Sequence, residues 1–282
     1  MRSSQVVRTQ LIKTIHERFG VELGVPDELP HVHELMRILE HRSHRRYVER
    51  PVDESLLRLL FACALSAPSK SDLQQADIIW VADAARRQRI ADLIPEMPWV
   101  QEAPVFLVFC GNGRRLPQIS AMREKTFAND HLDAFFNATV DAAIVMTTFI
   151  RAAAVVGLGC CPISVIRDHA EAVSALLELP ERVFPVAGMC VGYPAQTEQI
   201  SPRLSPAVTG HIDRYDETDV ELEIDRYDRR RHAQQPYAKQ RDVQRHGSAA
   251  FYGWSEDKAR QYARPQRVNF GRYVRARGFK LD

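Results

Sequence analysis

The chain has 282 residues and a mass of 32.2 kDa, which allows one large domain or two small ones. Apolar residues make up 45% and charged residues 26%, proportions that exclude disordered and fibrous proteins. The longest uncharged runs contain Gly and Pro and fall short of the roughly 18 apolar residues of a membrane span. Five cysteines without CxxC spacing disfavour a disulfide framework and a zinc site. We therefore expect a soluble, cytoplasmic protein without a metal.

Charge is distributed unevenly along the chain. The net charge is only +2, but residues 226–282 hold 15 Lys/Arg against 5 Asp/Glu, and the rest of the chain is acidic. A basic C-terminal arm on an acidic body suggests an anionic partner. A solvated helical surface explains the same composition.

Periodicity and turn signals predict a chain made mostly of helices. The predicted elements, in chain order, are helix 5–19, helix 31–41, helix 54–66, strand 78–81, helix 85–93, strand 105–110, helix 130–156, helix 168–179, strand 186–191, helix 217–231, helix 256–263 and helix 268–277. Asp53 is the expected N-cap of the third helix. Helix 130–156 is apolar on nearly every side, which is typical of a core helix or a subunit interface. The few strands are not spaced as βαβ units, so the pattern favours an α+β fold.

Three polar clusters are candidates for ligand binding. The first, HRSHRR at 41–46, combines guanidinium groups with a hydroxyl and is suited to phosphate. The second, APSKSDLQ at 67–74, is a polar loop between a helix and a strand. The third, GLGCCPIS at 157–164, has glycines that permit close backbone approach to a ligand. Each cluster alone also fits an ordinary surface or turn.

Other residues that carry chemistry have simpler explanations. Cys160 and Cys161 are expected to be buried structural thiols and not a redox pair. Asp141 and Arg151 lie in the apolar helix, where either a functional role or an intersubunit ion pair would explain them. His31 and His33 have no third ligand nearby, so we predict no metal site.

In order and spacing, these clusters together resemble the nitroreductase family of FMN-dependent NAD(P)H oxidoreductases, in particular its oxygen-insensitive NADPH nitroreductase and flavin reductase branch. The likeness rests on HRSHRRYVERPV, APSKSDLQ, GLGCCPIS, LPERVFPVAGMCVGYPA and Ser201-Pro202-Arg203-Leu204, and on a closing helical segment at 266–279. It covers residues 34–279. The resemblance implies a small central, mostly antiparallel sheet flanked by helices, in an intertwined homodimer. It also implies three segments: an N-terminal helical appendage (1–30), an FMN-binding core (31–210) and a basic helical arm of the same domain (211–282).

The resemblance assigns residues to the flavin. His41, Arg42, Ser43 and Arg203 would bind the FMN phosphate, and Arg45 would face the N1/C2 edge of the flavin ring. A cation there would stabilise the negative charge of the reduced ring. Ser69 would hydrogen-bond the flavin from the partner subunit, and Ser71 and Gln74 are further candidate flavin-binding residues. The backbone of Pro162, Ile163, Ser164 and Val165 would cover the side of the ring that carries N5.

The chain departs from the family pattern at three places. Ser201 stands where the family has a lysine, Ser164-Val165 replaces a Gly-Gly pair, and Met97-Pro98-Trp99 lacks the usual polar residues. These departures bear on flavin affinity and substrate range. Trp99 at the mouth of the site would suit a flat, apolar acceptor.

The resemblance implies an enzyme whose chemistry resides on the flavin, so no side chain is assigned as a catalytic acid or base. FMN would take hydride from NADPH, or from NADH, and pass it to nitroaromatic, quinone or related acceptors by a ping-pong mechanism. Arg245 and Arg267 are the expected readers of the NADPH phosphate. No nucleic acid or membrane partner is expected. The alternatives are another flavin enzyme on this fold (a flavin reductase, oxidase, dehydrogenase or dehalogenase) and a non-catalytic, nucleic-acid-associated protein that uses the basic arm.

Overall fold

A computed structural model describes residues 2–282 of the chain. The chain divides into two compact units. Unit 1 comprises residues 1–42 and 199–266, and unit 2 comprises residues 43–198 and 267–282. This division differs from the three predicted segments, because unit 1 combines the N-terminal appendage with most of the C-terminal arm.

Unit 2 is built on a four-stranded sheet, which confirms the predicted α+β class. Its strands are β1 (Ala76–Trp80), β2 (Val105–Asn112), β3 (Gly159–Ile163) and β4 (Val183–Gly192). They follow the order β1-β2-β4-β3, and every neighbouring pair is antiparallel. Strand β3 was not predicted, and it forms one edge of the sheet.

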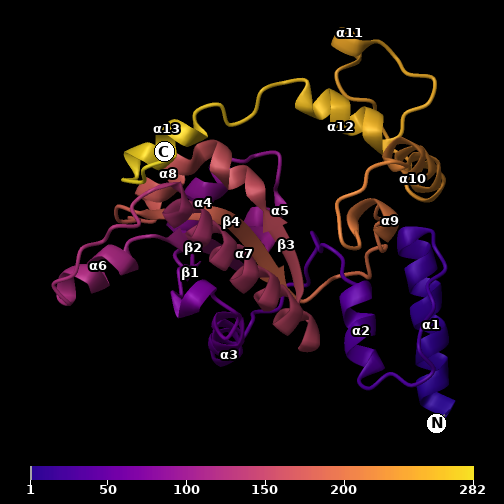
Figure 1. Ribbon diagram of the computed structural model, residues 1–282, viewed down its shortest axis with the longest axis horizontal. Coiled ribbons are helices and arrows are strands. Elements are labelled where there is room, and N and C mark those ends of the chain that lie inside the picture. Colours follow the sequence, from indigo (N-terminus) through magenta and orange to yellow (C-terminus); the bar gives the residue numbers. More distant parts are fainter. Residues whose placement is uncertain (1) are drawn as a thin grey trace. The chain divides into compact units, whose positions relative to one another are not determined.

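Helices cover both faces of this sheet. The helices of unit 2 are α3 (Glu54–Leu65), α4 (Ala84–Asp92), α5 (Trp99–Glu102), α6 (Arg115–Met122), α7 (Leu132–Val155), α8 (Ala170–Leu176) and α13 (Phe270–Ala276), with 3₁₀ turns η1 (Lys70–Asp72) and η2 (Ser164–His169). Figure 1 shows α7 lying along one face of the strands. Helices α5 and α6 were not predicted, whereas the N-cap of α3 is confirmed, because the carboxylate of Asp53 accepts hydrogen bonds from the backbone of Ser55 and Leu56.

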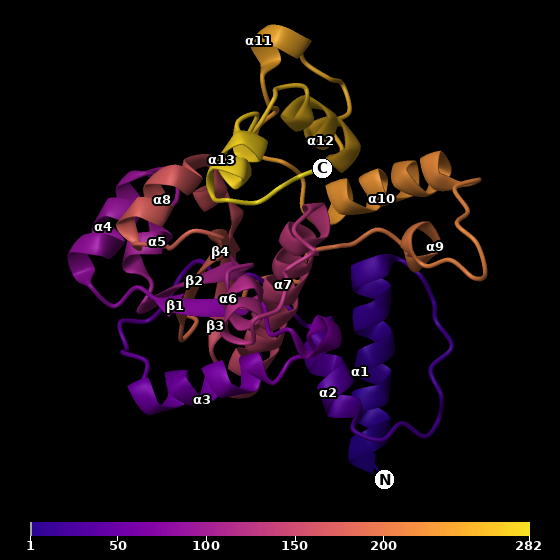
Figure 2. The same ribbon diagram turned by 60° about the vertical axis from the view of Figure 1, so that its left-hand side comes forward.

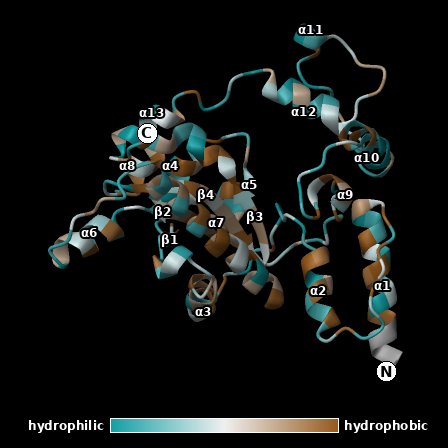
Figure 3. Cartoon of the chain, viewed as in Figure 1, coloured by the Kyte–Doolittle hydropathy of each residue, from teal (hydrophilic) through white to brown (hydrophobic). Residues whose placement is uncertain are grey.

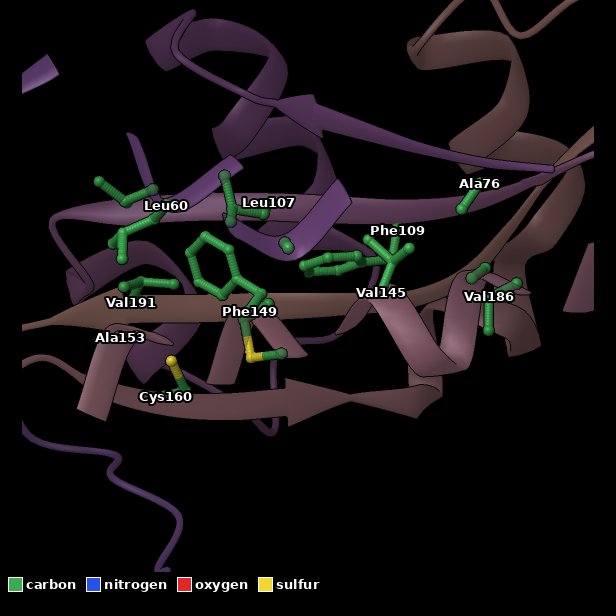
Figure 4. Close-up of a cluster of buried hydrophobic side chains, with 14 of the residues drawn as sticks. Leu60, Ala76, Leu107, Phe109, Val145, Phe149, Ala153, Cys160, Val186 and Val191 are labelled. Atoms are coloured by element: carbon green, nitrogen blue, oxygen red, sulfur yellow. The ribbon is translucent and has the colours of Figure 1, made fainter. Parts of the chain in front are cut away.

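The alternation of side chains along β2 creates two cores, one on each face of the sheet. Leu107 and Phe109 belong to the cluster that includes α3 and α7, and Phe106 and Val108 belong to the cluster that includes α4, α5 and α8. Phe149 of α7 meets Phe109 edge-on, with ring centroids 5.7 Å apart, in the core drawn in Figure 4. Hydrophobic residues are concentrated on the strands and on α7 (Figure 3).

By length and composition alone, α7 could cross a membrane. It instead packs one face against β2 and α3, with Ala138, Ala142 and Phe149 fully buried. Its opposite side exposes Leu132 and Phe136. One side of α7 therefore lies in the core, which is one of the two roles predicted for it, and the other side leaves apolar residues uncovered.

Unit 1 is helical. Its helices are α1 (Arg2–Phe19), α2 (Val32–Leu39), α9 (Pro206–Thr209), α10 (Val220–Gln234), α11 (Val243–His246) and α12 (Trp254–Tyr262). Figures 1 and 2 both show α1 and α2 side by side, with Leu11 and Ile15 packed on Val32 and Met36. Helices α10 and α12 also contact each other. The predicted appendage is therefore a packed part of unit 1.

Candidate functional site

In unit 1, the start of the HRS motif lies at the C-terminal end of α1. The Arg18 guanidinium is buried there, and its Nη1 donates hydrogen bonds to the carbonyl oxygens of Leu39 (2.7 Å) and His41 (2.9 Å). The backbone N–H of Arg203 donates to the carbonyl oxygen of Arg18 at 2.7 Å. The structure thus brings the predicted residues His41, Arg42 and Arg203 together around a residue that the sequence did not indicate.

Arg18, Arg42 and Arg203 form a cluster of positive charge, here called the arginine cluster. Burial lowers the pKa of Arg18, and the charges of Arg203 and Arg42 lower it further. Within the described part of the chain, no carboxylate forms an ion pair with any of the three. The Nε of Arg42 is buried without a hydrogen-bond partner. Like charges held together without a counter-charge suit a multiply charged anion, and guanidinium groups match phosphate geometry.

In unit 2, the continuation of the same motif lies against the edge strand β3. The backbone N–H of His44 donates to the carbonyl oxygen of Cys160 at 3.0 Å. A Cβ on Gly159 would lie 2.7 Å from the His44 ring, so this glycine makes room for a protein side chain. The prediction that the glycines of this segment permit close approach to a ligand is therefore wrong for Gly159. Gly157 instead turns the chain after α7, with a φ of +78°.

Arg45 lies near Trp99, at the start of α5. The guanidinium carbon is 5.7 Å from the centre of the Trp99 ring, a distance at which cation–π attraction operates. Arg45 is exposed, whereas Cys161 is buried beside this pair, and burial raises the pKa of its thiol. Burial also raises the pKa of the Cys160 thiol. Both cysteines are therefore buried and protonated near neutral pH, as predicted for structural thiols.

The polar loop at 67–74, called the Ser69 loop, is held by a buried carboxylate on α7. Asp141, which is 2% exposed, accepts hydrogen bonds from Ser69 Oγ (2.7 Å), Lys70 N (3.2 Å) and Gln75 N (2.9 Å). These contacts lie within one chain, so an intersubunit ion pair is not needed to explain Asp141. Ser69 Oγ also accepts a hydrogen bond from the backbone N–H of Gln74 at 2.7 Å. Since the hydroxyl proton points to Asp141, any further partner of Ser69 must be a donor.

The backbone of this loop is strained. Ser71, Asp72 and Gln74 have φ values of 48°, 57° and 50°, in the left-handed region that non-glycine residues rarely adopt. Ser69, Asp72, Gln74 and Asp141 line a cavity of about 1080 Å³ in unit 2. Strain of this kind persists only where surrounding contacts enforce it, and Asp141 supplies three of them.

The remaining flavin-binding candidates lie where β3 passes into η2. Pro162 and Ser164 are exposed, Val165 is partly buried and Ile163 is 2% exposed. The Ile163 side chain belongs to the core, so only its backbone is available to a ligand. Ser43 is partly buried, and Ser201 is exposed.

The two candidate NADPH readers have different environments. Arg267, in unit 2, forms an ion pair with Asp168, which offsets its charge. Arg245, on α11 in unit 1, is exposed, and it has no ion-pair partner among residues 2–282. The loop that carries it is anchored, since the Gln240 side chain both donates to and accepts from the backbone of Ala249 at 2.9 Å.

Comparison with known proteins relates both the motifs and the fold to one protein family. The sequence profile of the Nitroreductase family matches residues 38–193, and that of the Nitroreductase family, C-terminal domain matches residues 201–282. The chain belongs to the nitroreductase family. Residues 1–37 precede both matches, so α1 and most of α2 lie outside the family profiles.

Relatives support this membership, with matches that cover 76–98% of their own length. This nitroreductase-family chain is 30% identical over 248 residues to the FMN reductase [NAD(P)H] of Bacillus subtilis, covering 87% of this chain and 97% of that one. It is 34% identical over 188 residues to the oxygen-insensitive NADPH nitroreductase of Salmonella typhimurium, covering 67% and 76% of the two chains. The structure of NfrA2 from B. megaterium matches with a TM-score of 0.80 and 29% identity, covering 88% and 98%. The NADPH:FMN oxidoreductase of Vibrio harveyi, complexed with NAD+, matches with a TM-score of 0.74 and 28% identity, covering 87% and 97%.

Two residues that contact the candidate site residues were missed or misjudged from sequence. Arg18 lies in a helix that no family motif covers, and its partners are more than twenty residues away. Asp141 was noticed, but its role depends on the fold of the Ser69 loop. The predicted ligand residues are divided between the units: His41, Arg42, Arg203 and Arg245 lie in unit 1, and the others lie in unit 2.

Proposed function

We propose that this protein is a cytoplasmic, homodimeric, FMN-dependent oxidoreductase that takes hydride from NADPH and passes it to nitroaromatic, quinone or related acceptors by a ping-pong mechanism. The coarse class follows from family membership: the protein is an NAD(P)H-dependent flavin oxidoreductase, with FMN as cofactor. The observation that carries the proposal is the arginine cluster, which includes one residue from each of two family motifs and forms no ion pair with a carboxylate among the described residues.

The chain's own residues bind and orient the cofactor. Arg42 and Arg203 would bind the phosphate, with His41 and Ser43 beside them in the sequence. Arg45 would offer positive charge to the ring edge where reduction places negative charge. The Ser69 hydroxyl, with its proton directed to Asp141, would accept a hydrogen bond from a donor on the ring. FMN, when bound, supplies the group that carries hydride.

The class of enzyme is tested by the spectrum of the purified protein. A yellow preparation that releases FMN on denaturation, and whose flavin bleaches anaerobically with NADPH and recovers its colour with a quinone, would support the proposal. Initial rates that give parallel double-reciprocal lines would support the ping-pong order. A colourless protein that FMN cannot reconstitute would contradict it.

We expect the protein to be a homodimer, because α7 and α3 leave large apolar side chains uncovered on unit 2. Phe136 is 60% exposed and Leu65 is 53% exposed, and patches of this kind mark interaction surfaces. Light scattering should give twice the chain mass of 32.2 kDa. Phe136→Glu should shift the protein toward monomer, whereas Met122→Glu, at an exposed site on α6, should not. A flavin-loaded monomer in the unmodified protein would overturn this expectation.

NADPH should be preferred over NADH, and Arg245 should carry more of the preference than Arg267. Arg245 forms no ion pair with another described residue, so its contact with the 2′-phosphate should be worth about tenfold or more in kcat/KM. The charge of Arg267 is already offset by Asp168. We expect Arg245→Ala to narrow the NADPH/NADH ratio more than Arg267→Ala. Equal kcat/KM values with NADPH and NADH, or an NADPH/NADH ratio that neither substitution changes, would show that the basic arm does not recognise the 2′-phosphate.

A further inference from the structure

We propose that the N-terminal helix α1 is part of the cofactor site, and that Arg18 is a positioning residue which holds the two segments carrying Arg42 and Arg203 for binding the FMN phosphate. This inference rests on the proposed function. It gives a role to a helix that precedes both family profile matches.

Arg18 fixes the backbone immediately before Arg42. Its side chain leaves the last turn of α1 and is only 6% exposed. Because Nη1 donates to the carbonyl oxygens of both Leu39 and His41, one rigid planar group holds the chain at two points within three residues. Arg42 follows directly, so the course of the chain into Arg42 depends on Arg18.

The same turn of α1 fixes the backbone at Arg203. The last carbonyl groups of a helix have no partner within it, and here the carbonyl of Arg18 accepts the Arg203 N–H at 2.7 Å. Arg230 of α10 reinforces the contact, because Nη2 donates to the Arg203 carbonyl (2.5 Å) and Nη1 donates to the Glu17 carbonyl (3.4 Å). Both ligand-bearing segments are therefore attached to one residue through its side chain and its backbone.

The end of α1 is itself firmly held. Gly20 turns the chain with a φ of +71°, and a Cβ there would lie 2.6 Å from Arg230 Nε, so the turn is packed against α10. Leu11 and Ile15 anchor the helix on α2. If α1 were only a solvated appendage, it would need neither the contact with α10 nor the contact with α2. Bringing a third guanidinium to Arg42 and Arg203 is unfavourable without an anion and favourable with one, which is what a phosphate site requires.

The test compares FMN with riboflavin, which has the same ring and no phosphate. Arg18→Met keeps the aliphatic stem but loses the charge and the donors. We expect it to weaken FMN binding to the apoprotein about tenfold or more, measured by flavin fluorescence quenching, and to change riboflavin binding by less than about twofold. Arg18→Lys keeps the charge without the planar fork, so it should give an intermediate loss for FMN. It also provides the comparison if Arg18→Met does not fold.

Coupling between positions separates positioning from general stabilisation. If Arg18 acts through Arg203, the FMN loss in the Arg18→Met/Arg203→Ala double variant should be smaller than the product of the two single losses. Lys13→Ala, on the exposed side of α1, is the matched control and should bind FMN normally. Unchanged FMN affinity in Arg18→Met, or equal losses for FMN and riboflavin, would overturn the inference. Failure of the unmodified protein to bind FMN would instead overturn the proposed function.

Discussion

Replacing Arg42 or Arg203 by alanine is expected to weaken FMN binding by roughly 10–150-fold, because a hydrogen bond to a charged group is worth about 1.5–3 kcal/mol. Both residues belong to a cluster that forms no ion pair with a carboxylate of residues 2–282, so no such ion pair must be broken before they bind phosphate. Each variant also loses like-charge repulsion, so its apoprotein should remain folded. Titration of FMN into the apoprotein measures the effect.

The matched control for this prediction is Arg214→Ala, an exposed arginine of unit 1. It removes the same charge from the same unit without touching the cluster. If Arg42→Ala and Arg203→Ala bind FMN as tightly as Arg214→Ala does, the arginine cluster is not the phosphate site. Raising the salt concentration should weaken FMN binding more in the unmodified protein than in either cluster variant. Each variant has one charge fewer in the cluster, so salt has less attraction to screen.

Asp141→Ala is expected to lower the free energy of unfolding by roughly 2–3 kcal/mol. The substitution leaves the Ser69 hydroxyl and the backbone N–H groups of Lys70 and Gln75 without their acceptor. The hydrogen bond of Gln75 is buried and the other two are partly buried, and an unsatisfied buried donor costs about 1–3 kcal/mol. The loop would also lose the contacts that hold its left-handed residues. Asp141→Asn should lower the free energy of unfolding by less, because its amide oxygen can still accept a hydrogen bond. Some destabilisation should remain, because the amide NH₂ group would face a donor of the loop. Urea denaturation measures both changes.

Asp133 offers a close comparison for this carboxylate. It lies on the same helix and pairs with Lys70 of the same loop at 3.1 Å, but both side chains are about half exposed. Exposed ion pairs contribute little to stability, so Asp133→Ala should unfold close to the unmodified protein. Equal urea denaturation midpoints for Asp133→Ala and Asp141→Ala would show that the stability of the Ser69 loop does not depend on the Asp141 carboxylate.

Most helices could be predicted because their signals are local. Asp53 precedes an apolar repeat, and helix α3 begins at the residue after it. Helix α7 was recognised from its long apolar pattern, and its bounds of Leu132–Val155 differ from the predicted 130–156 only at the ends. Helix α8 begins later than predicted, since η2 occupies the first residues of that segment. These features depend on neighbours along the chain, which the sequence displays directly.

Strand β3 could not be predicted from its own residues. It contains Gly159 and Pro162, which local rules assign to turns. Proline is tolerated because β3 is an edge strand that pairs only with β4, so a missing N–H need not interrupt a ladder. The position of β3 in the sheet order is therefore what allows its composition, and sheet order is not a local property.

The candidate site was predictable only in part, for a related reason. The motifs identified Arg42, Arg45 and Arg203 by their residue types and order. Arg18 has its partners at Leu39, His41 and Arg203, and a charged residue on an amphipathic helix is expected to be solvated. The pairing of Arg267 with Asp168 was equally invisible. Both depend on long-range contacts that periodicity and motif spacing do not encode.

The contact between His44 and β3 has a consequence for aggregation. An exposed strand edge is a template on which another chain can add a strand. Here Pro162 offers no N–H, and the Cys160 carbonyl is already taken by the His44 N–H. The segment that follows the HRS motif therefore protects the sheet edge as well as contributing Arg45. Substitutions that detach Ser43–Tyr47 from β3 would expose a strand edge that can pair with another chain. We therefore expect such substitutions to lower the solubility of the protein.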